Sequence, residues 1–260
     1  MNKIKQFAAQ VKDNIKGLIS DHDLQKKSLD WMIDAGGKHQ YSYNFSWMGR
    51  PIIQYPQDMI AMQEIIWEIK PDLIIETGIA HGGSLIFYAS LLELLSASGY
   101  DDGKIVGIDI DIREHNRVEI EAHPMFKRIH MIEGSSIEYS VIEQVKEYAK
   151  DKNRILVILD SNHTHEHVLA ELEAYAPLVS TGSYCVVFDT LIEDTPKELI
   201  PDRPWGIGNS PKTAVWEYLR RLNEDGRMAA DGKPLNLNID KMIEKKLLIT
   251  VAPDGYLKRE

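Results

Sequence analysis

A carboxylate and an imidazole follow one apolar run of the chain, and a second carboxylate follows the next such run. Asp160 comes directly after residues 155–159, His163 lies three positions further on, and Asp189 follows residues 184–188. An imidazole can take up a proton near neutral pH, which suits a general base. Carboxylates suit a hard divalent ion such as Mg²⁺, which can orient two substrate hydroxyls and activate one of them. The pattern predicts His163 as a general base and Asp160 and Asp189 as metal ligands.

Two other interpretations use the same histidines. His163 could cap the helix that follows it. His163, His165 and His167 also stand at alternate positions, which could suggest a zinc site. Alternation suits a strand, however, and this segment begins a helix, so the three imidazoles cannot easily face one ion.

A glycine-rich turn follows an earlier apolar run. Its glycines lack the G-x-G-x-x-G spacing of a dinucleotide site, and the acidic residue before them would repel a diphosphate. A positively charged cofactor fits better, and S-adenosylmethionine carries a sulfonium and an α-ammonium group. Acidic residues before glycines also close ordinary strand-to-helix turns, so the pattern alone leaves both interpretations open. The predicted donor-binding residues of the turn are Glu76, Gly78, Ala80, Gly82 and Ser84.

Polar side chains also follow the second and third strand-like runs. Asp109 could accept hydrogen bonds from ribose hydroxyls, with Asp111 as the competing candidate, and either could instead cap the next helix. Ser135 and Ser136 are expected near the adenine, although Ser136 could equally be a helix N-cap. Asp160 completes the predicted cofactor-binding set.

Strand-length apolar runs alternate with helix-length periodic segments through the middle of the chain. This alternation predicts an α/β fold with a mainly parallel, doubly wound sheet covered on both faces. Ligands of such sheets bind at the carboxyl ends of the strands, where the polar residues above lie. The segment 246–257 predicts a last strand, antiparallel at the sheet edge.

The chain divides in the sequence into two parts. Residues 1–56 predict an N-terminal helical extension and an aromatic connector, and residues 57–260 predict the catalytic domain. The first 35 residues look amphipathic and are a possible homo-oligomer interface. The loop 201–211, rich in Pro, Gly and Trp, is a candidate lid or acceptor-binding loop, or else a rigid surface loop.

Composition excludes several classes of protein. A net charge of −10 without a Lys or Arg run argues against a nucleic-acid partner. No apolar run approaches the ~18 residues of a membrane span, and the N-terminus lacks the long apolar region of a signal peptide, which favours a cytoplasmic enzyme. The single Cys185 lies in an apolar run and is expected to be a buried thiol.

Several segments together resemble the cephalosporin hydroxylase family. They are Trp47-Met-Gly, Gln54-Tyr-Pro-Gln-Asp58, the turn from Glu76 to Ser84, Gly107-Ile-Asp-Ile-Asp111, Leu159-Asp-Ser-Asn-His163, Val187-Phe-Asp-Thr190, Asp202–Asn209, Lys212–Trp216 and Ala252–Tyr256. The resemblance covers most of the chain from about residue 40.

Despite its name, that family is similar to S-adenosylmethionine-dependent methyltransferases with a Rossmann-like, class I fold. Its relatives include rhamnosyl O-methyltransferases and metal-dependent O-methyltransferases of macrolide sugars. The resemblance implies an O-methyltransferase that uses S-adenosylmethionine and Mg²⁺. The implied acceptor is a sugar hydroxyl of a polysaccharide, glycolipid or natural product. It assigns Glu76 and Gly78 to the methionine end, Asp109 to the ribose, and His163 to the general base.

One departure from the family pattern concerns the metal. Relatives often have Glu-Asp where this chain has Phe188-Asp189, so one expected carboxylate ligand is missing. The metal site is then either weaker or completed by another acid, with Glu193 and Asp194 as the candidates. Two rival functions remain open at this stage. One is a metal-dependent oxygenase of a small metabolite, which needs two histidines and a carboxylate on one ion. The other is a protein that binds S-adenosylmethionine without catalysis.

Overall fold

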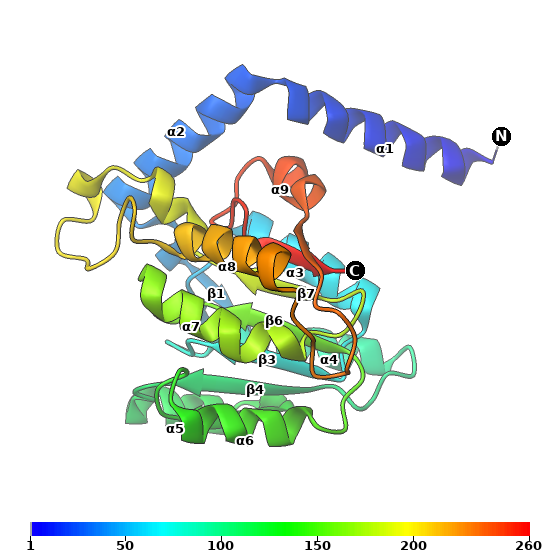
Figure 1. Ribbon diagram of the computed structural model, residues 1–260, viewed down its shortest axis with the longest axis vertical. Coiled ribbons are helices and arrows are strands. Elements are labelled where there is room, and N and C mark those ends of the chain that lie inside the picture. Colours follow the sequence, from blue (N-terminus) through cyan, green and yellow to red (C-terminus); the bar gives the residue numbers. More distant parts are fainter. Residues whose placement is uncertain (1) are drawn as a thin grey trace.

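The computed structural model describes residues 2–260 as one large sheet with helices on both faces, a separate β-hairpin and two long N-terminal helices (Figure 1). The strands are β1 (Phe45–Trp47), β2 (Arg50–Ile52), β3 (Leu73–Thr77), β4 (Lys104–Asp109), β5 (Ile129–Glu133), β6 (Ile155–Leu159), β7 (Tyr184–Val187), β8 (Leu237–Ile239) and β9 (Tyr256–Arg259). The α-helices are α1 (Lys3–Ser20), α2 (His22–His39), α3 (Pro56–Ile69), α4 (Gly83–Ser96), α5 (Glu114–Glu121), α6 (Tyr139–Ala149), α7 (His165–Tyr175), α8 (Pro211–Asp225) and α9 (Lys241–Leu247). Short 3₁₀ helices are η1 (Tyr41–Asn44), η2 (Pro124–Arg128), η3 (Ala176–Leu178), η4 (Thr190–Asp194) and η5 (Lys197–Leu199).

The large sheet has the strand order β5-β4-β3-β6-β7-β9-β8. The first five of these strands are parallel, whereas β9 runs antiparallel to β7 and to β8. The predicted α/β, mainly parallel, doubly wound fold is therefore confirmed. From β3 the chain builds outward to β4 and β5 and then returns to add β6 on the other side. The crevice between β3 and β6 is consequently the topological switch point, where α/β sheets bind ligands.

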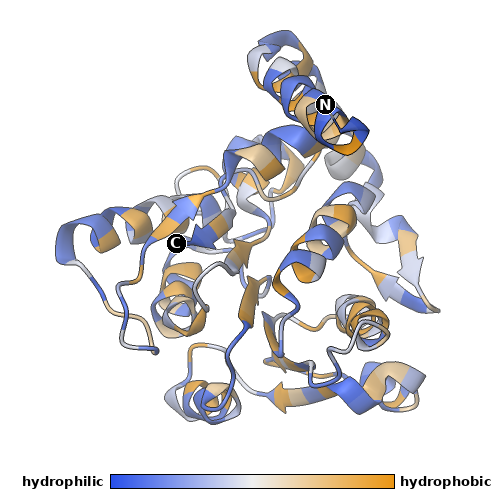
Figure 2. Ribbon diagram, turned by 90° about the vertical axis from the view of Figure 1, so that its right-hand side faces the viewer, coloured by the Kyte–Doolittle hydropathy of each residue, from blue (hydrophilic) through white to orange (hydrophobic). Residues whose placement is uncertain are grey.

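Alternate residues of the central strands build two cores, one on each face of the sheet. Ile75 and Val157 pack in a cluster with residues of α6, α7 and α8, whereas Ile74 and Leu156 pack with residues of α3 and α4. Figure 2 shows the hydrophobic residues concentrated in the strands and on the helix sides that turn toward them. Parallel strands that are buried on both faces explain why the sequence shows continuous apolar runs.

The prediction for the end of the chain is confirmed in one respect and wrong in two. A last strand does run antiparallel to its neighbour β7, but only Tyr256–Arg259 forms it, and the strand at this edge of the sheet is β8. Residues 246–251 instead end α9 and continue as a loop. The buried Asp58 of α3 accepts hydrogen bonds from Thr250 Oγ1 and the Val251 backbone N–H, which ties this loop to α3 and away from the sheet.

The N-terminal helices α1 and α2 project from the body of the molecule (Figure 1). The hairpin β1-β2 follows them and packs against α4 so closely that a Cβ on Gly83 would lie 2.1 Å from the Pro51 carbonyl oxygen. The hairpin therefore brings the residues after it to the beginning of α4. A domain boundary at residue 56 stays a prediction. Within residues 2–260, we find no helix with the length and hydropathy of a membrane span.

Candidate functional site

The ends of β3 and β6 meet at Gly78. The Asp160 backbone N–H donates to the Thr77 carbonyl oxygen at 3.0 Å, so the two strand ends stay in register. Gly78 has φ 91°, and a Cβ there would lie 2.0 Å from the Asp160 carbonyl oxygen. Only glycine satisfies both conditions, because other residues rarely adopt this φ and carry a Cβ. The glycine thus lets Asp160 stand directly beside the turn.

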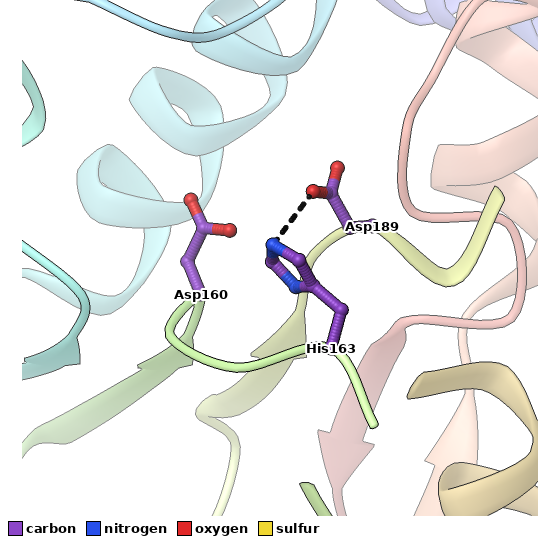
Figure 3. A group of neighbouring side chains, drawn as sticks. All are labelled: Asp160, His163 and Asp189. Carbon is purple, nitrogen blue, oxygen red and sulfur yellow. Dashed lines mark ion pairs between the residues drawn. The ribbon is translucent and has the colours of Figure 1, made fainter. Parts of the chain in front are cut away.

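Asp160, His163 and Asp189 converge at the carboxyl ends of β6 and β7. One ligand-type atom from each lies within 4.8 Å of the others, and among residues 2–260 this is the one such group of metal-binding side chains. His163 Nε2 is 3.2 Å from Asp189 Oδ2. Figure 3 shows the imidazole between the two carboxylates, with the contact to Asp189 dashed. The three residues that the sequence singles out for base and metal chemistry are therefore neighbours.

Negative charge accumulates around Asp160 without a fixed cation to balance it. Burial, reinforced by the charges of Asp189 and Glu76, raises the pKa of Asp160 well above its ordinary value. A carboxylate in such surroundings gains stability from any bound positive charge. The site can consequently hold a divalent ion, a sulfonium group or both.

The predicted substitutes for the missing carboxylate lie elsewhere, which corrects that expectation. Both oxygens of Glu193 accept from the Gly208 backbone N–H, at 3.1 and 3.0 Å, and one accepts from Ser210 Oγ at 2.6 Å. Asp194 pairs with Lys212. These two carboxylates hold the loop before α8 and the start of that helix, and they do not belong to the group around Asp160.

The loop that Glu193 anchors reaches back over the site. The Trp205 ring meets the His163 imidazole edge to face, with 4.8 Å between ring centroids and an angle of 85°. An aromatic ring in this position restricts the orientation of the imidazole and covers part of it from water. Trp205 therefore links the predicted lid loop 201–211 to the candidate base.

The three histidines of this region face three different partners. His163 contacts Asp189, whereas His165 Nδ1 lies 2.8 Å from Thr213 Oγ1. His167 Nε2 lies 3.0 Å from Ser136 Oγ. The helical turn of α7 separates the imidazoles, so they do not form a three-histidine zinc site.

Asp109 binds the glycine-rich turn itself. Its Oδ2 accepts from the backbone N–H groups of Ile79, at 2.8 Å, and Ala80, at 3.2 Å, and its Oδ1 accepts from Asp111 N at 3.1 Å. Helix α5 begins only at Glu114, so neither aspartate caps it. A carboxylate has about four lone-pair sites, which leaves Asp109 capacity for a ligand hydroxyl.

Ser136 is bound into a buried network that the sequence did not predict. Its Oγ donates to Glu171 Oε1 at 2.5 Å, as does Ser161 Oγ at 2.6 Å, and Glu171 is fully buried. His167 contacts both serine hydroxyls. The N-cap of α6 is Glu138, so the alternative role of Ser136 as a helix cap is wrong. The sequence contained one sign of this network, because Glu171 lies four residues after His167 and such pairs are neighbours on a helix.

Two adjoining cavities collect most of the predicted residues. The first, of about 240 Å³, is lined by Gly78, Ala80, Ser84, Asp160, His163 and Asp189, together with Gln54, Ser42 and Tyr43 from the N-terminal connector. The second, of about 300 Å³, is lined by Gly78, Ala80, Asp109, Ser135, Ser136 and Asp160, together with Ser161, His167 and Trp205.

Two of the predicted donor-binding residues line neither cavity. Gly82 faces Ile120 and begins α4 with φ 79°. Glu76 is fully buried behind Ser84, whose Oγ donates to Glu76 Oε2 at 3.1 Å, while Glu76 Oε1 has no hydrogen-bond partner. A direct contact of either residue with the donor therefore needs a test of its own.

The burial of Glu76 predicts how stability depends on pH. Burial raises the pKa of Glu76 to about 8, so the folded protein holds a proton that the unfolded chain releases above its ordinary pKa of ~4.3. The free energy of unfolding should therefore fall as pH rises through this window, by at most about 1.4 kcal/mol per pH unit from this group. Glu76→Gln should flatten the decrease in Tm between pH 6 and 8, measured by differential scanning calorimetry. The exposed Glu166→Gln serves as control, and parallel Tm profiles for Glu76→Gln and wild type would contradict the interpretation.

The family described as Rhamnosyl O-methyltransferase/CmcI matches residues 39–260. The rhamnosyl O-methyltransferase of Mycobacterium bovis (strain BCG / Pasteur 1173P2) is 30% identical over 231 residues, which cover 85% of this chain and 83% of that protein. The rhamnosyl O-methyltransferase of Mycobacterium leprae (strain TN) is 29% identical over 216 residues, with 83% of each chain covered. The apo-structure of CmcI has a TM-score of 0.56 at 19% identity, covers 84% of this chain and 76% of its own, and shows the same fold.

These matches agree with the site geometry and with the predicted enzyme class, an S-adenosylmethionine-dependent O-methyltransferase. They do not favour the oxygenase alternative. The family match extends over most of the chain and includes the glycine-rich turn and the residues that follow β6 and β7. The chain belongs to the Rhamnosyl O-methyltransferase/CmcI family.

Proposed function

We propose that this enzyme transfers a methyl group from S-adenosylmethionine to a sugar hydroxyl, assisted by a divalent ion such as Mg²⁺. The observation that carries the proposal is the convergence of His163, Asp160 and Asp189 in the first cavity, with Asp160 also lining the second. The relatives named rhamnosyl O-methyltransferases support a sugar acceptor. The Mg-SAM form of CmcI, at 18% identity, a TM-score of 0.56 and coverage of 84% of this chain and 77% of its own, supports the choice of donor and ion.

In this proposal the donor extends through both cavities. The adenosyl part lies in the second cavity, with the ribose near Asp109 and the adenine near Ser135 and Ser136. The methionine end lies in the first cavity, near Gly78 and Ser84. In this proposal the reactive sulfonium group lies at the shared rim, next to Asp160, whose surroundings favour positive charge.

The side chains at the rim fit a divalent ion. Asp160 and Asp189 each offer carboxylate oxygens, the ligands that Mg²⁺ prefers, and Mg²⁺ commonly keeps several waters beside one or two carboxylates. Two protein carboxylates therefore suffice, although Phe188 replaces a third. A bound ion supplies Lewis acidity that lowers the pKa of a substrate hydroxyl.

His163 takes the hydroxyl proton of the acceptor at Nδ1, because Nε2 faces Asp189 Oδ2 at 3.2 Å and carries the N–H that donates to that carboxylate. The new imidazolium then gains stability from the adjacent negative charge. The Trp205 ring also contacts the imidazole. Much of the rate acceleration comes from positioning the attacking oxygen against the methyl group.

The open part of the first cavity is the proposed acceptor site. Tyr43 lines it and is about half exposed, while Ser42 lies next to it with a hydroxyl group. Aromatic faces and hydroxyls are suited to a sugar ring, which has apolar C–H faces and polar edges. The aromatic connector therefore contributes to acceptor recognition in this proposal.

The proposal predicts methylation of a rhamnoside in vitro. Purified protein with S-adenosylmethionine, Mg²⁺ and an alkyl α-rhamnoside should yield S-adenosylhomocysteine and a product heavier by one methylene, detected by mass spectrometry. A catechol and a primary alcohol serve as comparison acceptors. Donor binding without turnover on any glycoside would contradict the sugar assignment, and iron-dependent oxygen consumption would favour the oxygenase.

The predictions on assembly and location stand beside this proposal. We infer that the enzyme is cytoplasmic. We also infer that it has no nucleic-acid partner, which its net charge of −10 supports. Residues 57–260 are the proposed methyltransferase domain, and light scattering would determine whether the N-terminal helices make a homo-oligomer.

A further inference from the structure

Gln54 is a buried polar residue of the first cavity to which the mechanism above gives no role. It lies between β2 and α3 and is 3% exposed. It lines the same cavity as Gly78, Ser84 and Asp160. Its Nε2 donates to Tyr88 Oη at 3.3 Å, while its Oε1 is buried and has no hydrogen-bond partner. A buried carbonyl oxygen in a ligand cavity, left without a donor, calls for an explanation.

Tyr88 is the hydrogen-bond partner of the Gln54 amide. Burial, with the Glu76 carboxyl group adding to it, raises the pKa of Tyr88 well above its ordinary value, so the side chain stays a neutral phenol. Its oxygen accepts from Gln54 Nε2, and Gln54 Oε1 has no partner. The amide oxygen is therefore the end that is left for a ligand.

A second unsatisfied acceptor belongs to the same region. Glu76 Oε1 is buried without a partner, and its Oε2 accepts from Ser84, which lines the cavity together with Gln54. Because the pKa of Glu76 is about 8, its carboxyl group is protonated at neutral pH, and a bound positive charge would favour the ionised form, whose oxygens only accept. Together with Gln54 Oε1, it then matches a ligand group that carries several N–H donors and a positive charge. A carboxylate or phosphate would be repelled by the same pair.

We propose that Gln54 Oε1 binds the α-ammonium group of S-adenosylmethionine, beside Glu76, which the family resemblance already assigns to the methionine end. This inference rests on the proposed donor and adds a residue from the N-terminal connector to its site. Gln54 is a positioning residue in this assignment, because it holds the amino-acid end while the methyl group reacts elsewhere. The close packing of Pro51 on Gly83 keeps the connector, and with it Gln54, at the start of α4.

The test compares two ligands by isothermal titration. S-adenosylhomocysteine carries the α-ammonium group, whereas 5′-methylthioadenosine lacks the whole amino-acid part. Gln54→Ala should weaken S-adenosylhomocysteine binding about 10- to 100-fold, the range for a hydrogen bond to a charged group. Binding of 5′-methylthioadenosine should change less than about 2-fold, because that ligand has no ammonium group for Gln54 to bind.

Matched variants separate the contact from effects on folding. Gln57→Ala removes another buried, unpartnered amide oxygen, one that lines neither cavity, and should leave both affinities unchanged. Gln54→Met keeps the side-chain volume without the acceptor and should behave as Gln54→Ala does. Gln54→Glu restores an acceptor and should recover S-adenosylhomocysteine binding.

The possible failures have different meanings. Equal losses for both ligands, or unchanged S-adenosylhomocysteine binding in Gln54→Ala and Gln54→Met, would overturn the role of Gln54 and leave the donor assignment intact. If the wild-type protein binds neither ligand, the proposed donor itself fails, and the Gln54 assignment fails with it.

Discussion

His163→Ala should lower kcat by about 10²- to 10⁴-fold, the usual contribution of a general base, while the Kd of S-adenosylhomocysteine changes less than about 2-fold. The separation is expected because the imidazole lies on the rim beside Asp189, whereas the predicted adenine-side residues line the second cavity. Steady-state kinetics with saturating Mg²⁺ and isothermal titration measure the two quantities on the same preparation.

Neighbouring histidines provide the control for this experiment. His165→Ala removes an imidazole two residues away that contacts Thr213 and lines neither cavity, so kcat should stay within about 3-fold of wild type. Comparable losses of turnover and donor affinity in His163→Ala would refute the general-base role.

The geometry also permits His163 to be a metal ligand, and a third measurement distinguishes the two roles. His163 Nε2 belongs to the group that can hold an ion, together with Asp160 and Asp189. If His163 acts as the base, Mn²⁺ affinity measured by electron paramagnetic resonance should be nearly equal in His163→Ala and wild type. A large loss of Mn²⁺ binding in that variant would reassign the imidazole to the metal.

Asp189→Asn should weaken the binding of a divalent ion by more than about 10- to 100-fold, because that is the loss typical of residues that only orient a metal ligand. The same change should lower kcat at a fixed Mg²⁺ concentration. The effect is expected to be large because Phe188 leaves only Asp160 and Asp189 as carboxylates at the site, and Glu193 and Asp194 are bound elsewhere. Titration of Mn²⁺ and the Mg²⁺ dependence of turnover test the prediction.

Two controls accompany this metal prediction. Asp111→Asn removes an exposed carboxylate that lines neither cavity and should leave the Mg²⁺ dependence unchanged. Chelation of the wild-type enzyme should abolish turnover, and added Mg²⁺ should restore it. If Asp160→Asn and Asp189→Asn respond to Mg²⁺ as wild type does, the metal does not bind at these residues.

The sequence predicts the architecture and most of the site because both follow from local patterns. Apolar runs of strand length, separated by helical segments, define a parallel sheet, and parallel strands end at one edge. Asp160 and Asp189 follow directly after such runs, and His163 lies three positions after Asp160, so their approach could be expected before any coordinates. Gly78 could also be expected, because a strand-to-helix turn of this kind requires glycine.

The sequence failed where long-range contacts decide the outcome. The run 246–251 has the composition of a strand, yet hydrogen bonds to Asp58, almost 200 residues earlier, hold it as a loop. The proximity of Glu193 to Asp189 in the sequence suggested a shared ion. Gly208 and Ser210 instead donate hydrogen bonds to Glu193. Only the folded chain shows that this loop, and not the ion, takes up the Glu193 carboxylate.

The sequence by itself therefore determined the fold class, the family and the rim residues, because strand periodicity and short motifs are local properties. Only the tertiary structure decided that Glu76 is buried behind Ser84, that Asp109 binds the glycine-rich turn, and that Gln54 lines the same cavity as Asp160. These outcomes depend on which hydrogen-bond partners remain after the sheet, the hairpin and the helices have packed. Burial and competition for partners are properties of the whole fold, and no short segment of sequence contains them.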